Sequence, residues 1–240
     1  MPKPDAGAPE DWAGHLAREE ARYRDGEERL LSPGEDSDAR QRQLTRLGNA
    51  AGGAGLSLLM LGRRADASEW FERGAERYRE SFVDAPPGSW GRPIGAIKAL
   101  VLADDWPGAE HAAAWALDSG AARADSPIGR YAAALALLVL GRDKEARVHA
   151  DEIRIRDDFP NDVGDALAFL AAQDVLGYAD AVESVLESFE TRDEYLEDLP
   201  VADTVLVLQA LAGRRDMAAE LSSPLLPASR PRSSADGERR

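Results

Sequence analysis

The sequence predicts an all-α protein: a right-handed α-solenoid of about five antiparallel helical hairpins with an N-terminal capping helix. Two observations lead to this fold class. Alanine, the strongest helix former, occurs 43 times, whereas aromatic residues make up only 6% of the chain. In addition, a turn followed by a helix recurs at intervals of 35 to 42 residues, which is typical of stacked helical hairpins.

The first expected helix runs from Glu10 to Leu31. Trp12, Leu16, Tyr23 and Leu30 follow one another at spacings of four and seven residues, which places them on one stripe of a helix. The opposite face is almost wholly charged, as the outer face of a capping helix must be.

After the break at Ser32-Pro33-Gly34, a second helix is expected from about Asp38 to Leu61. Shorter helices then follow one another to about Leu221.

The recurring unit is a small turn followed by an alanine. Leu140-Gly141 precedes Ala146 in this way, and Gly177-Tyr178 precedes Ala181. A small residue at this position lets the second helix of a hairpin approach the first closely. The anchoring alanines are spaced 42, 37, 35 and 37 residues apart: Ala67, Ala109, Ala146, Ala181 and Ala218.

This pattern resembles the tetratricopeptide repeat, whose unit is a helical hairpin of 34 residues. The likeness covers roughly Ala50 to Leu221, and it is that of a divergent member because the first-helix signature is poor and the terminal proline is missing at most units. The resemblance implies a stack of hairpins with a concave groove, and a role in partner recognition or scaffolding.

The expected domain organisation is one α-solenoid domain between two disordered tails. The domain covers residues 10–227, with a capping region at 10–47 and the repeats at 48–221. Residues 1–9 and 228–240 are polar or rich in Pro and Gly, and they carry no apolar periodicity.

Charge and composition exclude several classes of function. The net charge of −15 argues against binding to nucleic acid and to anionic membrane surfaces. The absence of Cys excludes disulfides and thiolate chemistry. The apolar run from Ala132 to Leu140 is about half of a membrane span. No signal peptide pattern opens the chain, so a cytoplasmic location is expected.

No catalytic, cofactor-binding or metal-binding residue is predicted, and the chain is not expected to be an enzyme. The three histidines lack the spacing of a helical metal site. The glycine cluster Gly48, Gly52, Gly53 and Gly55 lacks the Gly-Lys-Ser/Thr of a phosphate loop. It is instead expected to serve close helix packing, or a helix break near Gly52-Gly53.

The leading hypothesis is a non-catalytic scaffold that binds another protein through the concave face. In the tetratricopeptide frame the first helices of the central repeats carry apolar residues where a solvated groove would be polar. Either the N-terminal helix fills the groove, or a partner does, and we expect a partner: a basic or hydrophobic segment, or a second copy of the chain. The candidate partner-binding residues are Trp90, Arg92, Lys98, Tyr131, Leu135 and Leu138.

Two other classes of function stay open. Bacterial immunity proteins that neutralise toxins include small acidic helical domains, so this is the alternative function. An enzyme would need polar residues that only the fold brings together.

Overall fold

The computed structural model describes residues 10–30 and 36–228. These residues form ten α-helices and two short 3-10 helices, and they contain no β-strand. The predicted all-α class is therefore confirmed. The expected break at Ser32-Pro33-Gly34 and the expected tails, apart from Ala228, lie outside the described residues.

The observed boundaries follow the expected ones closely at the N-terminal end, where the first two helices begin and end within two residues of the predicted limits. In chain order the elements are α1 (Trp12–Leu30), α2 (Ser37–Met60), α3 (Arg64–Val83), α4 (Gly91–Leu102), α5 (Trp106–Asp118), η1 (Ala121–Arg123), α6 (Pro127–Val139), α7 (Asp143–Ile153), α8 (Asn161–Ala172), α9 (Val175–Glu190), η2 (Leu196–Asp198) and α10 (Asp203–Gly213).

Side-chain caps fix where several helices begin. The carboxylate of Asp105 accepts a hydrogen bond from the amide of Gly108 at 3.0 Å, and Asp174 does the same for Gly177 at the start of α9. Ser126 caps α6 in this way, directly before the proline at its first position. These caps use amide groups that have no partner within the helix.

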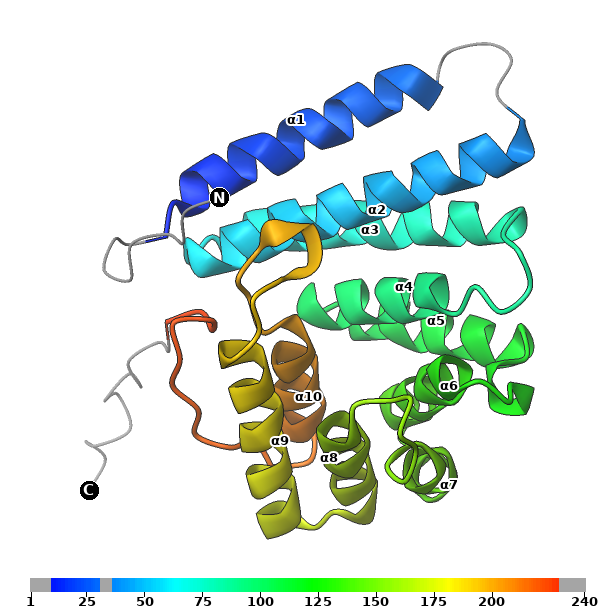
Figure 1. Cartoon of the computed structure of the whole chain (residues 1–240), viewed down its shortest axis with the longest axis vertical. Helices are drawn as coiled ribbons and strands as arrows, with labels where there is room; N and C mark the ends of the chain where they lie inside the picture. Colours follow the sequence, from blue (N-terminus) through cyan, green and yellow to red (C-terminus); the bar gives the residue numbers. More distant parts are fainter. Residues whose placement is uncertain (1–9, 31–35, 229–240) are drawn as a thin grey trace, which may run out of the picture.

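Consecutive helices pack in pairs, α2 with α3, α4 with α5, α6 with α7 and α8 with α9 (Figure 1). The alanine at each pair contact is buried, as the repeat frame predicts: Ala67, Ala109, Ala146 and Ala181. The last unit differs from the prediction. Between α10 and residue 228, where the description ends, the chain forms no second helix, and Ala218 is exposed. The described residues therefore contain four complete hairpins, with the single helix α1 before them and the single helix α10 after them.

The glycine cluster of α2 serves close packing. A Cβ atom at Gly55 would lie 2.6 Å from Cε1 of Phe71, and one at Gly48 would lie 2.8 Å from Cε1 of Tyr78. Helix α2 runs unbroken through Gly52-Gly53, so the alternative of a helix break is wrong. The absent side chains let α3 lie directly against α2.

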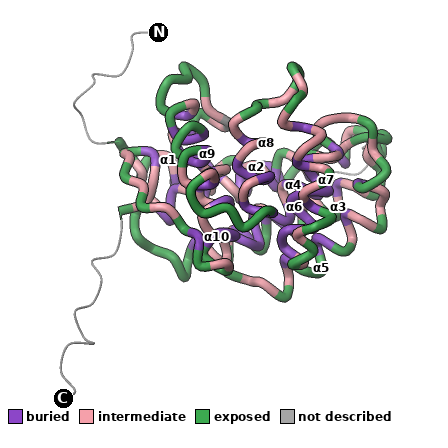
Figure 2. The backbone as a smooth tube through the Cα atoms, turned by 90° about the horizontal axis from the view of Figure 1, so that it is seen from below, coloured by how far each residue is buried: buried purple, intermediate pink, exposed green. Residues whose placement is uncertain are grey.

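The first helices of the later units, α4, α6, α8 and α10, pack against one another in a ring. Helix α4 packs against α6, α6 against α8, α8 against α10, and α10 returns to α4. In α6 every residue from Tyr131 to Val139 is buried, and Figure 2 shows the buried segments gathered where these helices meet. Within the described residues, no helix has both the length and the apolar character needed to cross a bilayer.

This closure corrects the expectation of an open groove over α6. Tyr131, Leu135 and Leu138 are 8%, 1% and 1% exposed, because the chain's own α4, α5, α7 and α8 pack around the helix that carries them. Neither the N-terminal helix nor a partner is needed for that purpose. Helix α10 is suited to its position against α4, α8 and α9 because Asp203 is its single charged residue.

The buried alanines provide a test of the repeat frame. We expect Ala146→Leu to overpack the contact between α6 and α7 and to lower the free energy of unfolding by about 1–3 kcal/mol. The matched control is Ala218→Leu, because Ala218 has the equivalent sequence position but is exposed, so its effect stays within about 0.5 kcal/mol. Urea denaturation measures the free energy of unfolding of both variants. Equal losses would contradict the assignment of Ala146 to a close helix contact of the repeat frame.

Candidate functional site

A cavity of about 420 Å³ lies between α2 and α4, on the side where the first helices of the units face one another. Its third wall is the connector of residues 191–202, which leaves α9, reaches α2 and returns to α10 (Figure 1). The lining residues that matter below are Thr45, Asn49, Gly52, Leu56, Tyr78, Arg92, Lys98, Leu102, Arg192, Glu197 and Asp203.

The two helices give the cavity a polar and an apolar end. Thr45, Asn49, Gly52 and Leu56 follow one another on α2 at three- and four-residue spacings, so they share one face. From Thr45 to Leu56 this face extends about 16 Å at 1.5 Å per residue. On α4 the corresponding order runs from Arg92 to Leu102.

Glycines keep the cavity open. A Cβ atom at Gly52 or at Gly91 would meet no atom within 4 Å, so both positions face empty space. At Gly95 the missing side chain instead makes room for the ring of Tyr78, which would lie 2.7 Å from a Cβ atom there.

Tyr78 and Asn49 form a polar chain across the middle of the cavity. The Tyr78 hydroxyl donates to Oδ1 of Asn49 at 2.8 Å, and Nδ2 of Asn49 donates to Oε1 of Glu197 at 2.8 Å. Burial raises the pKa of Tyr78, and the carboxylates of Glu197 and Asp203 raise it further. The hydroxyl therefore stays protonated at neutral pH and acts as a donor.

An ion pair between Lys98 and Asp203 joins α4 to α10. The ammonium lies 2.5 Å from Oδ2 of Asp203 and donates to the Thr204 hydroxyl at 3.2 Å. Burial lowers the pKa of Lys98, but the charge and the hydrogen bond of Asp203 outweigh this effect, so that the pKa is raised overall. Lys98 is therefore charged at neutral pH and is occupied by its partner.

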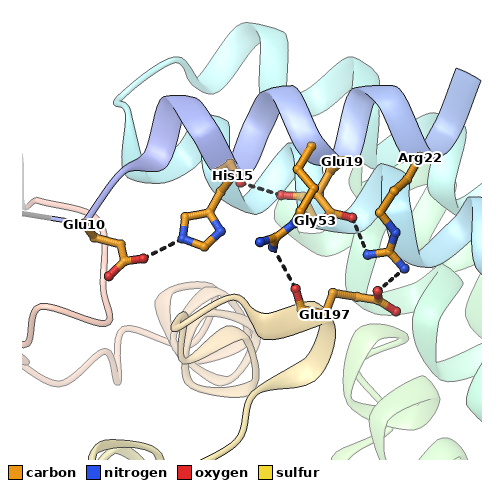
Figure 3. Close-up of polar contacts among 8 residues, drawn as sticks. Glu10, His15, Glu19, Arg22, Gly53 and Glu197 are labelled. Carbon is orange, nitrogen blue, oxygen red and sulfur yellow. Dashed lines mark hydrogen bonds and ion pairs between the residues drawn. The ribbon is translucent and has the colours of Figure 1, made fainter. Parts of the chain in front are cut away.

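The connector is held on its other side by α1. Glu19 is fully buried and accepts hydrogen bonds from Nε of Arg18 at 2.9 Å and from a guanidinium nitrogen of Arg22 at 2.8 Å. Arg18 also donates to the backbone carbonyl of Glu197 at 2.9 Å, and Arg22 forms an ion pair with the Glu197 carboxylate (Figure 3). We call Arg18, Glu19, Arg22 and Glu197 the α1 clasp.

The clasp holds a turn that is unfavourable by itself. Glu197 and Asp198 have φ angles of +57° and +56°, which side-chain-bearing residues adopt at a cost in conformational energy. The next residue, Leu199, packs at Gly53, where a Cβ atom would lie 2.9 Å from its Cδ1. The contacts of the turn with α1 and α2 offset this cost.

Two arginines at the cavity lack a carboxylate partner among the described residues. The Nε of Arg92 donates to the Ser81 hydroxyl at 2.7 Å, and the guanidinium also donates to the side-chain oxygen of Gln41. Arg192 lies over the ring of Phe189, 3.6 Å from its centroid. Neither arginine forms an ion pair, in a chain whose net charge is −15.

The structure brings only two of the six predicted partner-binding residues to this cavity, namely Arg92 and Lys98. Trp90 packs instead against Phe82, at 6.3 Å between ring centroids, and against Gly129 of α6, so it is a local core residue. Tyr131, Leu135 and Leu138 lie in the core between α6 and its neighbours.

Sequence reasoning missed the residues that complete the site. Gln41, Thr45 and Asn49 recur at four-residue intervals on α2, and this uncharged polar stripe continues along the helix to the cavity-lining positions Thr45 and Asn49. Glu197 carried no such signal, because its role depends on a turn that is held by α1 from 175 residues or more away.

No protein-family model matches the chain, and no curated protein and no solved structure matches it either. Within the part of the chain that the structure describes, no group of three or more His, Asp or Glu residues is placed to hold a metal ion.

The Lys98–Asp203 pair tests the contact between α4 and α10. We expect Lys98→Met to lower the free energy of unfolding by about 2 kcal/mol, because it leaves the Asp203 carboxylate partly buried without a partner. Lys98→Met combined with Asp203→Asn is expected to cost less than the sum of the two single changes. A double-mutant cycle in urea measures this coupling.

The control for this cycle is the exposed pair of Arg142 and Glu145, for which weaker coupling than that of Lys98 with Asp203 is expected because water and salt screen the two charges. If the changes in unfolding free energy of the Lys98 and Asp203 variants simply add, the ion pair between α4 and α10 is contradicted.

Proposed function

We propose that this protein is a non-catalytic binding protein of the tetratricopeptide-like kind, a right-handed solenoid of helical hairpins that holds a segment of another protein in the cytoplasm. The observation that carries the proposal is the cavity between α2 and α4, with empty space at Gly52 and Gly91. Cavities of this size with largely apolar walls and a few convergent polar groups are typical of ligand sites.

The position of the cavity favours a binding function for the array. It lies between the first helices of two adjacent units, which is the side on which stacked hairpins present their concave surface. Relative to the sequence prediction, the proposed site moves from α6 to α2 and α4, because α6 is buried among its neighbouring helices.

The dimensions of the cavity suit a short peptide segment. Its α2 wall is about 16 Å long, which corresponds to about five residues of extended chain at 3.3 Å per residue. Leu56 and Leu102 at one end accept an apolar side chain, and the polar side chains at the other end accept a polar one.

Site-specific photocrosslinking tests the proposal. A photoreactive leucine analogue at Leu56 lies at the cavity, and the same analogue at Val148 serves as the control, because Val148 is exposed on α7. In cytosol from the native source we expect cross-links from position 56 to one recurrent segment of another polypeptide, and none to that segment from position 148.

A synthetic peptide of the cross-linked segment then tests the site itself. We expect it to bind the unmodified protein and to lose at least tenfold in affinity with Gly52→Leu, which fills the open space beside α2. Gly213→Leu is the matched control, because a Cβ atom there also meets nothing and the position lies away from the cavity. No cross-link from position 56, or equal affinity for all three proteins, would contradict the proposal.

A further inference from the structure

The cavity is lined by more positive than negative side chains, and this excess indicates the charge of the ligand that it binds. Two carboxylates line the cavity, and each has a cationic partner: Glu197 pairs with Arg22, and Asp203 pairs with Lys98. The remaining charged lining residues, Arg92 and Arg192, have no carboxylate partner among the described residues. The cavity therefore carries a surplus of positive charge.

Arg92 is the unusual member of this pair because it is half-buried. Burial lowers its pKa, and its hydrogen-bond acceptors are the neutral side chains of Ser81 and Gln41. In the described part of the chain it is the one half-buried arginine without an ion pair. The other half-buried arginines each contact a carboxylate: Arg77, Arg130, Arg147, Arg154, Arg156 and Arg215.

A cation that is partly removed from water without a counter-charge is unfavourable, and an anion that reaches it gains a strong interaction. The guanidinium fork of an arginine matches the two oxygens of a carboxylate. Salt screens exposed charges that are more than about 8 Å apart. The net negative charge of the rest of the protein therefore does not cancel the attraction between Arg92 and an anion in direct contact with it.

On α2, α3 and α4 the other end of the cavity is apolar. Leu56 of α2, Phe71 of α3 and Leu102 of α4 line it, and no charged residue of the lining lies beyond Lys98 on α4. The open space at Gly52 lies between this end and the end that carries Thr45 and Arg92. An occupant that satisfies both ends is amphipathic.

We propose that the group that enters the cavity is a carboxylate carried on an apolar body. The carboxylate pairs with Arg92, and the apolar body lies past Gly52 towards Leu56 and Leu102. This inference rests on the part of the proposed function that makes this cavity a binding site, since it specifies the chemistry of what that cavity binds. The shared chemistry occurs in a free aliphatic acid and in an acidic side chain beside an apolar one in a partner's segment.

Three probes of equal chain length isolate the charge: octanoate, 1-octanol and octylammonium. We expect octanoate to bind with at least tenfold higher affinity than octylammonium, and 1-octanol to lie between them. Isothermal titration calorimetry at low ionic strength measures all three. Equal affinities, or a preference for octylammonium, would overturn the inference.

The position of the anion is tested by variants. Arg92→Gln is expected to reduce octanoate affinity about tenfold and to leave 1-octanol binding unchanged, whereas Arg92→Lys keeps most of the preference. Because Arg92 also supports Ser81 and Gln41, Arg192→Gln serves as an exposed second variant, with a loss of two- to threefold expected. Gly52→Leu is expected to abolish binding of octanoate and 1-octanol, with Gly213→Leu as the control.

A pair of capped peptides distinguishes the two sources. Acetyl-Leu-Glu-Leu-amide and acetyl-Leu-Gln-Leu-amide differ only in the carboxylate. A preference for the glutamate peptide that depends on Arg92 indicates a partner's segment, and binding of octanoate alone indicates a free acid; both support the inference. If neither probe family shows a preference for the anion, the inference fails, whereas the photocrosslink from position 56 still decides the proposed function separately.

Discussion

The inner face of α6 must be covered, and the rest of the architecture depends on how this is done. All residues from Ala132 to Val139 are apolar and buried. Exposure of this helix to water would therefore lose the hydrophobic free energy that the burial of these side chains contributes. The chain covers it with its own neighbouring helices, α4, α5, α7 and α8. Helix α10 reaches α4, which turns a row of hairpins into a closed cluster on this side, and a cavity lies between α2 and α4.

The connector between α9 and α10 makes this closure possible. It reaches α1 and α2 before it returns to α10, and the α1 clasp holds its left-handed turn at Glu197. The N-terminal helix therefore has two roles, since it packs along α2 and also positions one wall of the cavity. Fully buried Glu19 is central to both, because its two arginine partners are the ones that hold the turn.

Local signals predicted most of the fold, and long-range contacts explain what they missed. The alanine spacing identified four real hairpin contacts, because a close helix crossing needs a small residue whatever surrounds it. The same signal was misleading at Ala218, where no second helix follows α10. The apolar character of α6 was read correctly as a demand for burial. The pairing of α10 with α4 could not be predicted, because it depends on contacts between residues about a hundred positions apart, such as Lys98 and Asp203.

The most direct test of this account is the distance between α1 and the connector in solution. The chain has no native cysteine, so spin labels at Ala17→Cys and Glu194→Cys, both exposed positions, report only this distance. Labels at Ala17→Cys and Arg46→Cys control for the packing of α1 on α2. Double electron–electron resonance is expected to give one narrow distribution for each pair, and Glu197→Ala is expected to broaden the first alone. A broad distribution for the first pair in the otherwise unmodified chain, with the control pair narrow, would contradict the closed arrangement.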